Sequence, residues 1–174
     1  MRTIKKIIIH HTASGRDITT LEMVDAWHKA RWPQFKSSLG FWVGYHWLIG
    51  HDWIKQTRAD QEDGAHTYGF NADSIGISLT GNFEDEMPNQ YQLDQLRQLV
   101  LSLLGKYNLQ EKDIYCHRDL TATACPGKNL TKELLHNLFA IAPAPAPAPA
   151  PISPDKQKLN AFLAELQAVI NRYK

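Results

Sequence analysis

The sequence has little cysteine and no excess of charge of either sign. Only two of its 174 residues are cysteine, and 19 Lys+Arg against 18 Asp+Glu give a formal net charge of +1. Two thiols exclude the disulfide framework of a small secreted protein and leave open a single loop-closing bond between Cys116 and Cys125. Nucleic-acid-binding proteins typically carry a marked basic excess, so we expect no nucleic-acid partner.

Long apolar runs are also missing. The run Ile7–Ile9 is shorter than the roughly 7–15 apolar residues of a secretory signal, and no run approaches the ~20 residues of a membrane span. We therefore expect no signal peptide and no transmembrane segment, and a protein that is made in the cytosol without an obvious export route.

The apolar patterns that are present predict an α/β fold. With 43% hydrophobic residues, the chain can bury one proper core. Strands are expected over residues 4–9, 41–49, 53–57, 74–80 and 114–116, and helices from residue 19 to before Pro33, over 89–107 and over 130–139. Strands separated by helices indicate a three-layer domain, with a central mixed β-sheet flanked by helices.

Capping residues indicate where two of the helices begin and end. Thr19 and Glu22 have the spacing of a capping box, and Asn89 and Gln92 are expected to cap the second helix, which Asn108 ends. The expected inner face of the first helix consists of Leu21, Val24, Trp27 and Ala30.

The composition changes abruptly after residue 141. A strict Ala-Pro repeat favours a semi-rigid polyproline spacer about 30 Å long at ~3.1 Å per residue. The last segment has the pattern of an amphipathic helix, whose apolar stripe has three possible partners: the first domain, a second copy or an envelope surface. We expect a catalytic-size domain over residues 1–141, a linker over 142–152 and a C-terminal amphipathic helix over 153–174.

Residues with side chains that can bind a metal or act in catalysis follow two of the predicted strands in the sequence. His10 and His11 follow the isoleucine run, and His117 follows the strand 114–116, with Cys125 in a Cys-Pro-Gly turn. A hydrolytic zinc enzyme needs about three protein ligands and one position for water, and two histidines and a cysteine would supply that set. A cysteine hydrolase with Cys125 as nucleophile and His117 as base is an alternative, but no third, orienting group is in clear view.

Five segments, in order along the chain, resemble one known family. They are residues 8–13 (IIHHTA), 43–49 (VGYHWLI), 64–66 (GAH), 71–83 (NADSIGISLTGNF) and 117–127, which begins with His-Arg-Asp and ends with Cys-Pro-Gly. In these segments the sequence is similar to the zinc-dependent N-acetylmuramoyl-L-alanine amidases, which include small bacteriophage endolysins and animal peptidoglycan recognition proteins. The Ala-Pro tract and the last helix lie outside the resemblance.

The resemblance implies a Zn²⁺ site made by His10, His117 and Cys125. Only one of the two adjacent histidines can take the ligand position. The metal histidine of the family directly follows the apolar strand, which selects His10. Alternation along the strand then directs His11 to the other face, as an ordinary polar contact.

The resemblance also implies roles for residues around the metal. Tyr45 matches the active-site tyrosine of the family, whose phenol can hydrogen-bond the developing oxyanion. Thr123 stands where some phage enzymes carry a lysine, so it is a second catalytic candidate that can only donate a neutral hydrogen bond. The candidates for lining the substrate groove are Trp42, His46, Arg58, His66 and Asn71.

The implied activity is hydrolysis of the amide bond between N-acetylmuramic acid and L-alanine in peptidoglycan. A phage or prophage endolysin, made in the host cytoplasm and released to act on the cell wall, fits the expected lack of a signal peptide. Cytosolic muropeptide-recycling amidases carry a catalytic glutamate where this sequence has Ser78, which argues against recycling. A peptidoglycan-binding module without catalysis is a further alternative, although such relatives typically lack the cysteine ligand.

Overall fold

A computed structural model of the protein describes residues 2–140. The predicted linker (142–152) and C-terminal helix (153–174) lie outside the described residues, so both stay predictions. Within residues 2–140, no helix has the length and apolar character needed to cross a membrane.

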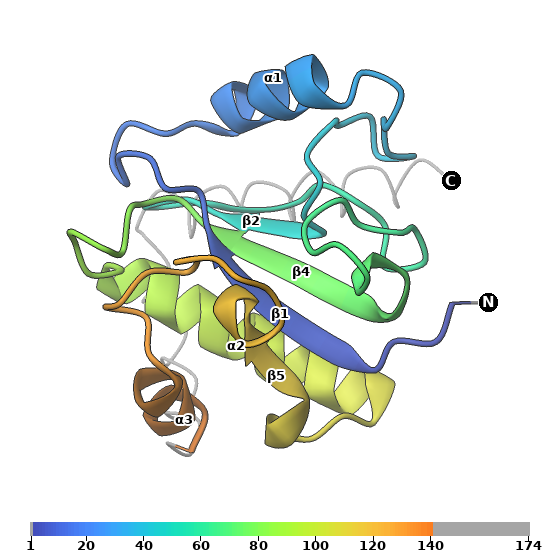
Figure 1. The fold of residues 1–174 in the computed structure, drawn as a ribbon. Helices are drawn as coiled ribbons and strands as arrows, with labels where there is room; N and C mark the ends of the chain where they lie inside the picture. Colours follow the sequence, from blue (N-terminus) through green and yellow to red (C-terminus); the bar gives the residue numbers. More distant parts are fainter. Residues whose placement is uncertain (1, 141–174) are drawn as a thin grey trace, which may run out of the picture. The chain divides into compact units, whose positions relative to one another are not determined.

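A mixed five-stranded sheet forms the centre of the described part of the chain (Figure 1). Its strands are β1 (Lys6–His11), β2 (Trp47–Ile49), β3 (Ile54–Gln56), β4 (Ser74–Leu79) and β5 (Ile114–Cys116), in the spatial order β3-β2-β4-β1-β5. Only the β2–β3 hairpin is antiparallel, and the other three neighbouring pairs are parallel.

Helices cover both faces of this sheet, which confirms the three-layer prediction for residues 2–140. Helix α1 (Leu21–Arg31) lies on one side, and α2 (Gln90–Tyr107) and α3 (Lys132–Ala140) lie on the other (Figure 1). Short 3-10 turns precede or follow two strands: η1 (Asn71–Asp73), η2 (Glu111–Asp113) and η3 (His117–Asp119).

Strand β1 is buried on both faces and divides its side chains between the two layers. Ile7 and Ile9 belong to the main core, together with Leu96 and Val100 of α2. Because side chains alternate along a strand, His10 points to the opposite face, toward α1. A smaller core of Val24, Val43 and Leu48 lies on that face.

The start and the inner face of α1 differ from the prediction. The N-cap is Thr20, whose hydroxyl accepts a hydrogen bond from the Met23 N–H, whereas the Thr19 hydroxyl donates to the Gly15 carbonyl oxygen, 2.6 Å away. Trp27 is 44% exposed and Ala30 is also exposed, so neither faces the core.

The predicted strand over residues 41–49 is shorter in the structure, where β2 covers only Trp47–Ile49. Side chains of α1 bind the backbone of the residues before it. The Asp25 carboxylate of α1 accepts hydrogen bonds from the backbone N–H groups of Trp42 and Val43, and His28 Nδ1 accepts one from Gly44. These backbone groups therefore bond to side chains of α1 instead of to a neighbouring strand.

The predicted ends of α2 are confirmed. Asn89 is the N-cap and forms a reciprocal capping box with Gln92, and Asn108 ends the helix in the left-handed conformation at φ 52°. Helix α3 begins at Lys132, slightly later than the predicted residue 130.

The outer edge of β5 is closed by its own turns. The backbone N–H of Ile114 bonds to the Glu111 carbonyl oxygen, and the N–H of Cys116 bonds to a carboxylate oxygen of Asp119 at 2.8 Å. Alternate N–H groups of this strand therefore bond to η2 and η3 rather than being left unpaired.

We predict that Gln92→Ala lowers the free energy of unfolding by ~1–3 kcal/mol, because it removes partners from buried polar groups. Gln92 is fully buried, and its Nε2 donates to the Thr80 carbonyl oxygen at 2.7 Å. Urea denaturation provides the measurement. Gln98→Ala, the same change at an exposed position of α2, is the control; equal losses in the two variants would contradict the assignment.

Candidate metal site and groove

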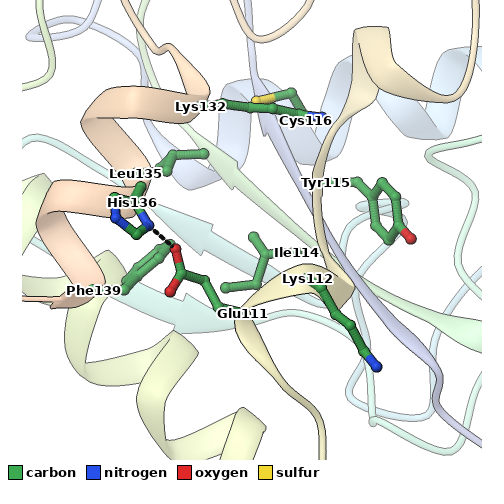
Figure 2. Close-up of a pocket in the computed structure, with 9 residues that line it drawn as sticks. All are labelled: Glu111, Lys112, Ile114, Tyr115, Cys116, Lys132, Leu135, His136 and Phe139. Atoms are coloured by element: carbon green, nitrogen blue, oxygen red, sulfur yellow. Dashed lines mark hydrogen bonds and ion pairs between the residues drawn. The ribbon is translucent and has the colours of Figure 1, made fainter.

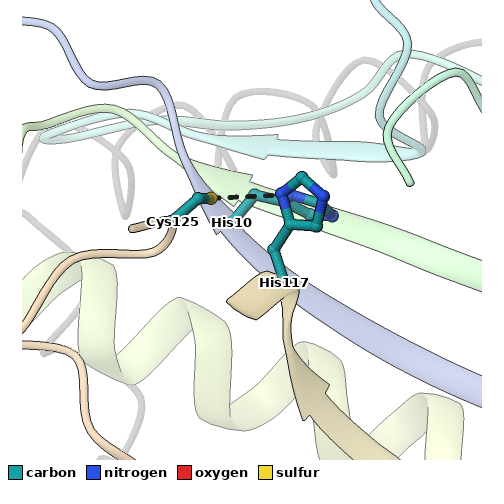
Figure 3. A group of neighbouring side chains, drawn as sticks. All are labelled: His10, His117 and Cys125. Atoms are coloured by element: carbon teal, nitrogen blue, oxygen red, sulfur yellow. Dashed lines mark hydrogen bonds between the residues drawn. The ribbon is translucent and has the colours of Figure 1, made fainter. Parts of the chain in front are cut away.

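Three side chains from distant parts of the chain converge beyond the carboxyl end of β1. One ligand atom each from His10, His117 and Cys125 can be chosen so that all three lie within 4.8 Å of one another (Figure 3). His10 Nδ1 is 3.7 Å from Cys125 Sγ, and the two imidazole ring centres are 4.5 Å apart. The structure thus brings together the three residues that the sequence predicted as metal ligands.

The sheet topology explains the meeting of the two histidines. Strands β1 and β5 are parallel neighbours, with Ile9 opposite Cys116. His10 follows Ile9 and His117 follows Cys116, so both histidines lie at the carboxyl end of these parallel strands. His11 points to the other face as expected, where its Nδ1 accepts a hydrogen bond from the Phe83 N–H at 3.1 Å.

Arg118 holds the loop that carries Cys125. Its backbone N–H donates to the Cys125 carbonyl oxygen at 2.9 Å, and its guanidinium donates to the carbonyl oxygens of Gly127 and Leu130 at 2.8 and 2.6 Å. Gly127 has φ 97°, and a Cβ there would lie 2.3 Å from the Phe83 carbonyl carbon. Only glycine therefore suits this position, because it tolerates both the left-handed backbone and the close approach.

The donor set suits a divalent metal ion. Burial, together with the neighbouring His117, lowers the pKa of His10 well below its ordinary value, and burial also lowers the pKa of His117. Both imidazoles therefore have a lone pair available at neutral pH. Burial raises the pKa of the Cys125 thiol to about 12 in the metal-free protein, while the His11 N–H, 3.4 Å from Sγ, favours the thiolate. Two imidazole nitrogens and a thiolate are typical zinc ligands.

His66 lies directly against His10. The His66 Nδ1 is 3.1 Å from His10 Nε2, on the side of the His10 ring away from Cys125. Such a contact with the second nitrogen of a ligand histidine orients its ring. Asn71 supports His66 indirectly, because its side-chain oxygen accepts hydrogen bonds from the N–H groups of His66 and Thr67, both at 2.9 Å.

Two glycines leave the space that the His66 ring occupies. A Cβ on Gly64 would lie 2.3 Å from the ring, and a Cβ on Gly76 would lie 2.5 Å from it. The His66 ring thus fits against the backbone at two glycine positions, where no side chain takes up the space.

A cavity of about 710 Å³ opens beside His117, one of the three candidate ligands. Tyr45, His66, Asn71 and His117 line it together with Trp27, His28, Arg31, Trp32, Ala65, Thr67, Tyr68 and Thr121. The predicted residues Tyr45, His66 and Asn71 are therefore brought together around a cavity that His117 also lines. Their catalytic and substrate-binding roles stay predictions.

Tyr45 lies between His10 and α1. Its ring centre is 5.2 Å from that of His10 and 5.3 Å from that of His28. Burial raises the pKa of the phenol, so the hydroxyl stays protonated at neutral pH and can donate a hydrogen bond.

His28 also lines the cavity, and the sequence did not predict it as a site residue. Its Nδ1 accepts the Gly44 N–H at 2.8 Å, and burial lowers its pKa to about 4, so it is neutral. Its position four residues after the buried Val24 on α1 was a signal that could have placed it on the inner face.

Four predicted residues do not line the cavity. His46 and Arg58 are 0% and 3% exposed and bond to backbone: the Gly76 N–H donates to His46 Nδ1 at 3.0 Å, and Arg58 donates to the Phe35 carbonyl oxygen at 2.9 Å. Both residues therefore bond to loop backbone inside the molecule and are not among the residues that line this cavity, so their substrate-binding roles stay predictions. Trp42 lies outside the cavity, and the exposed Thr123 accepts a hydrogen bond from the Cys125 N–H at 3.2 Å.

A second cavity of about 430 Å³ lies between α3 and the segment η2–β5 (Figure 2). Its floor includes Ile114, Leu135 and Phe139, and a Glu111–His136 pair stands at its side. None of the predicted site residues lines it. The two cysteines do not pair, and Cys116 is a buried free thiol facing this cavity.

Comparison with known proteins decides the family. The family model described as "N-acetylmuramoyl-L-alanine amidase" matches residues 1–128. The chain belongs to this amidase family. The match contains His10, His117 and Cys125, and it contains every residue that the sequence predicted for the site.

Relatives of the chain include both amidases and recognition proteins. A peptidoglycan recognition protein of Trichoplusia ni is 30% identical over 136 residues, which are 76% of this chain and 74% of that protein. Peptidoglycan-recognition protein SC2 of Drosophila melanogaster is 32% identical over 136 residues, covering 73% of this chain and 70% of that protein. Among solved structures, the amidase LysC from Clostridium intestinale is 31% identical with a TM-score of 0.67, over 78% of this chain and 85% of that one.

We predict that Gly76→Ala displaces the His66 ring and lowers the free energy of unfolding by ~1–3 kcal/mol, as overpacking of a buried site does. Thermal unfolding gives the energy, and a crystal structure of the variant gives the ring position. Gly105→Ala is the control, because nothing lies within 4 Å of a Cβ at this α2 position. It should be stabilising by ~0.5–1 kcal/mol. An unmoved His66 in the first variant would refute the packing argument.

Proposed function

We propose that the chain is a zinc-dependent hydrolase of the amide bond between N-acetylmuramic acid and L-alanine. The observation that carries this proposal is the meeting of His10, His117 and Cys125, of which His117 lines a cavity, in a chain of the amidase family. Family membership alone does not separate catalysis from recognition. The complete His-His-Cys set supports catalysis, because non-catalytic relatives typically lack the cysteine ligand.

Zinc held by these three residues would supply a Lewis acid that acidifies water and polarises the scissile carbonyl. The residues of the chain orient the reacting groups. Tyr45 presents a protonated phenol toward the metal ligands and can donate a hydrogen bond to the developing oxyanion. His66 fixes the ring of His10, and the cavity leaves room for the peptide and the sugar.

A lytic role is favoured over recycling of wall fragments. Ser78 lies directly opposite His10 in the β1–β4 register, so it occupies the face of the sheet on which a recycling enzyme would need its glutamate. A serine hydroxyl is no comparable base at neutral pH. An endolysin LysCS from Clostridium intestinale is 31% identical over 78% of this chain, which supports the phage or prophage reading. We place the enzyme in the host cytoplasm before its release onto the wall.

Digestion of purified cell walls with and without a chelator tests this function. The expected result is new amino groups on L-alanine without new reducing sugar ends, with activity lost on chelation and restored by Zn²⁺. New reducing ends would identify a glycosidase instead. Binding to walls without any new end group would identify a recognition module.

We predict that Cys125→Ala loses bound zinc and wall-degrading activity together, because a third ligand is removed from the metal. Cys116→Ala is the matched control: this thiol is buried in the main core and is not one of the three ligands. The control should keep one zinc per chain and its activity. Zinc content by elemental analysis and wall turbidity are the measurements, and a Cys125→Ala protein that degraded walls normally would rule out the assignment.

A further inference from the structure

Three cations gather around two indole rings at the end of α1 and in the loop that follows it. Lys29 Nζ and Lys36 Nζ each lie 4.4 Å from the centre of the Trp42 ring, and the Arg31 guanidinium carbon lies 4.9 Å from the centre of the Trp32 ring. We call these five residues the basic–aromatic patch. Its three cationic side chains belong to exposed residues.

The two rings are held in place by the fold. Trp42 Nε1 donates to the Pro33 carbonyl oxygen at 2.8 Å, and the backbone N–H of Trp42 is bound by the Asp25 carboxylate. The Trp32 ring lies edge-on to the His28 ring, with centres 5.3 Å apart. The cations therefore rest on a preorganised surface, so less conformational entropy is lost when they bind an anion.

The positive charge of the patch is not neutralised by the described part of the chain. None of its three cations forms an ion pair with residues 2–140, whereas Lys6, Lys106 and Lys132 elsewhere each do. The nearby Asp25 carboxylate is engaged by backbone N–H groups, and Glu62 binds the backbone of Ser38 and Ala59. A chain with a net charge of only +1 thus concentrates unpaired cations on this face.

The patch is continuous with the groove. Arg31 and Trp32 line the same cavity as Tyr45 and His117, while Lys29 and Lys36 lie outside it around Trp42. A polymer with one segment in the cavity would therefore have its neighbouring segments near the two lysines.

We propose that the basic–aromatic patch binds the free carboxylates of stem peptides adjacent to the one in the cavity. The proposal rests on the proposed function and adds that the preferred substrate is polymeric peptidoglycan rather than a soluble fragment. The glycan is uncharged where its muramic acid carries a peptide, and free carboxylates repeat along the polymer on those peptides. Such a repeated anion suits several weak contacts acting together, which raise the effective concentration of the substrate at the groove.

The test compares insoluble walls with soluble disaccharide-peptide monomers as substrates of the zinc-loaded full chain. For Lys29→Gln/Lys36→Gln, we expect the KM for walls to rise roughly tenfold at low salt, with kcat and the hydrolysis of monomers unchanged. Salt should weaken wall binding by the wild type more than by the variant, because exposed charges are screened.

The matched control is Lys5→Gln/Lys112→Gln, which removes the same charge from exposed positions away from the patch. Asp73 keeps its closer partner, Lys6, in that variant. If the control loses as much wall affinity as the patch variant, or if the patch variant behaves as the wild type, the proposal is overturned. Cosedimentation with walls measures binding by the patch even if no hydrolysis occurs. A failure of the proposed hydrolysis can therefore be distinguished from a failure of the patch proposal.

Modified walls identify the anion. On walls with amidated stem carboxylates, the wild type and the patch variant should bind with equal affinity. On walls stripped of phosphate polymers, the wild type should still bind more tightly than the variant. The opposite pair of results would assign the patch to phosphates and overturn the carboxylate proposal. Lysine-dependent binding to anionic phospholipid vesicles, with no such dependence on walls, would overturn it in favour of a membrane surface.

Discussion

The parallel pairing of β1 with β5 is the constraint on which the site depends. It aligns Ile9 with Cys116, so His10 and His117, far apart in sequence, leave the sheet side by side. Because both faces of β1 are buried, a slip of one residue would move every isoleucine to the wrong layer and exchange His10 for His11. The packing that stabilises the core therefore also selects which histidine faces the groove.

The position of Cys125 depends on polar contacts rather than on the sheet. Cys125 lies in a loop without regular structure, and Arg118 ties that loop to the strand end by bonding three of its carbonyl oxygens. The neighbours of the ligands in the sequence thus have their own tasks: Arg118 positions Cys125, and Asp119 caps β5.

The sequence predicted the layers, the central strands, the caps of α2 and the meeting of His10, His117 and Cys125, because each follows from a local pattern or from a family motif. Prediction failed where side chains bond to backbone across the chain. Asp25 and His28 draw residues 42–44 away from the sheet, and no spacing rule shows this. His46 and Arg58 resemble groove residues by composition, but their burial follows from loop contacts that only the fold reveals.

The capped margin of β5 has a consequence for how copies of the protein behave in concentrated solution. A sheet border with unpaired amide groups invites another chain to add a strand, which is a common route to aggregation. Here η2 and η3 occupy those groups from within the same molecule. These two N–H groups are thus unavailable for pairing with a second copy, which disfavours strand addition along this border.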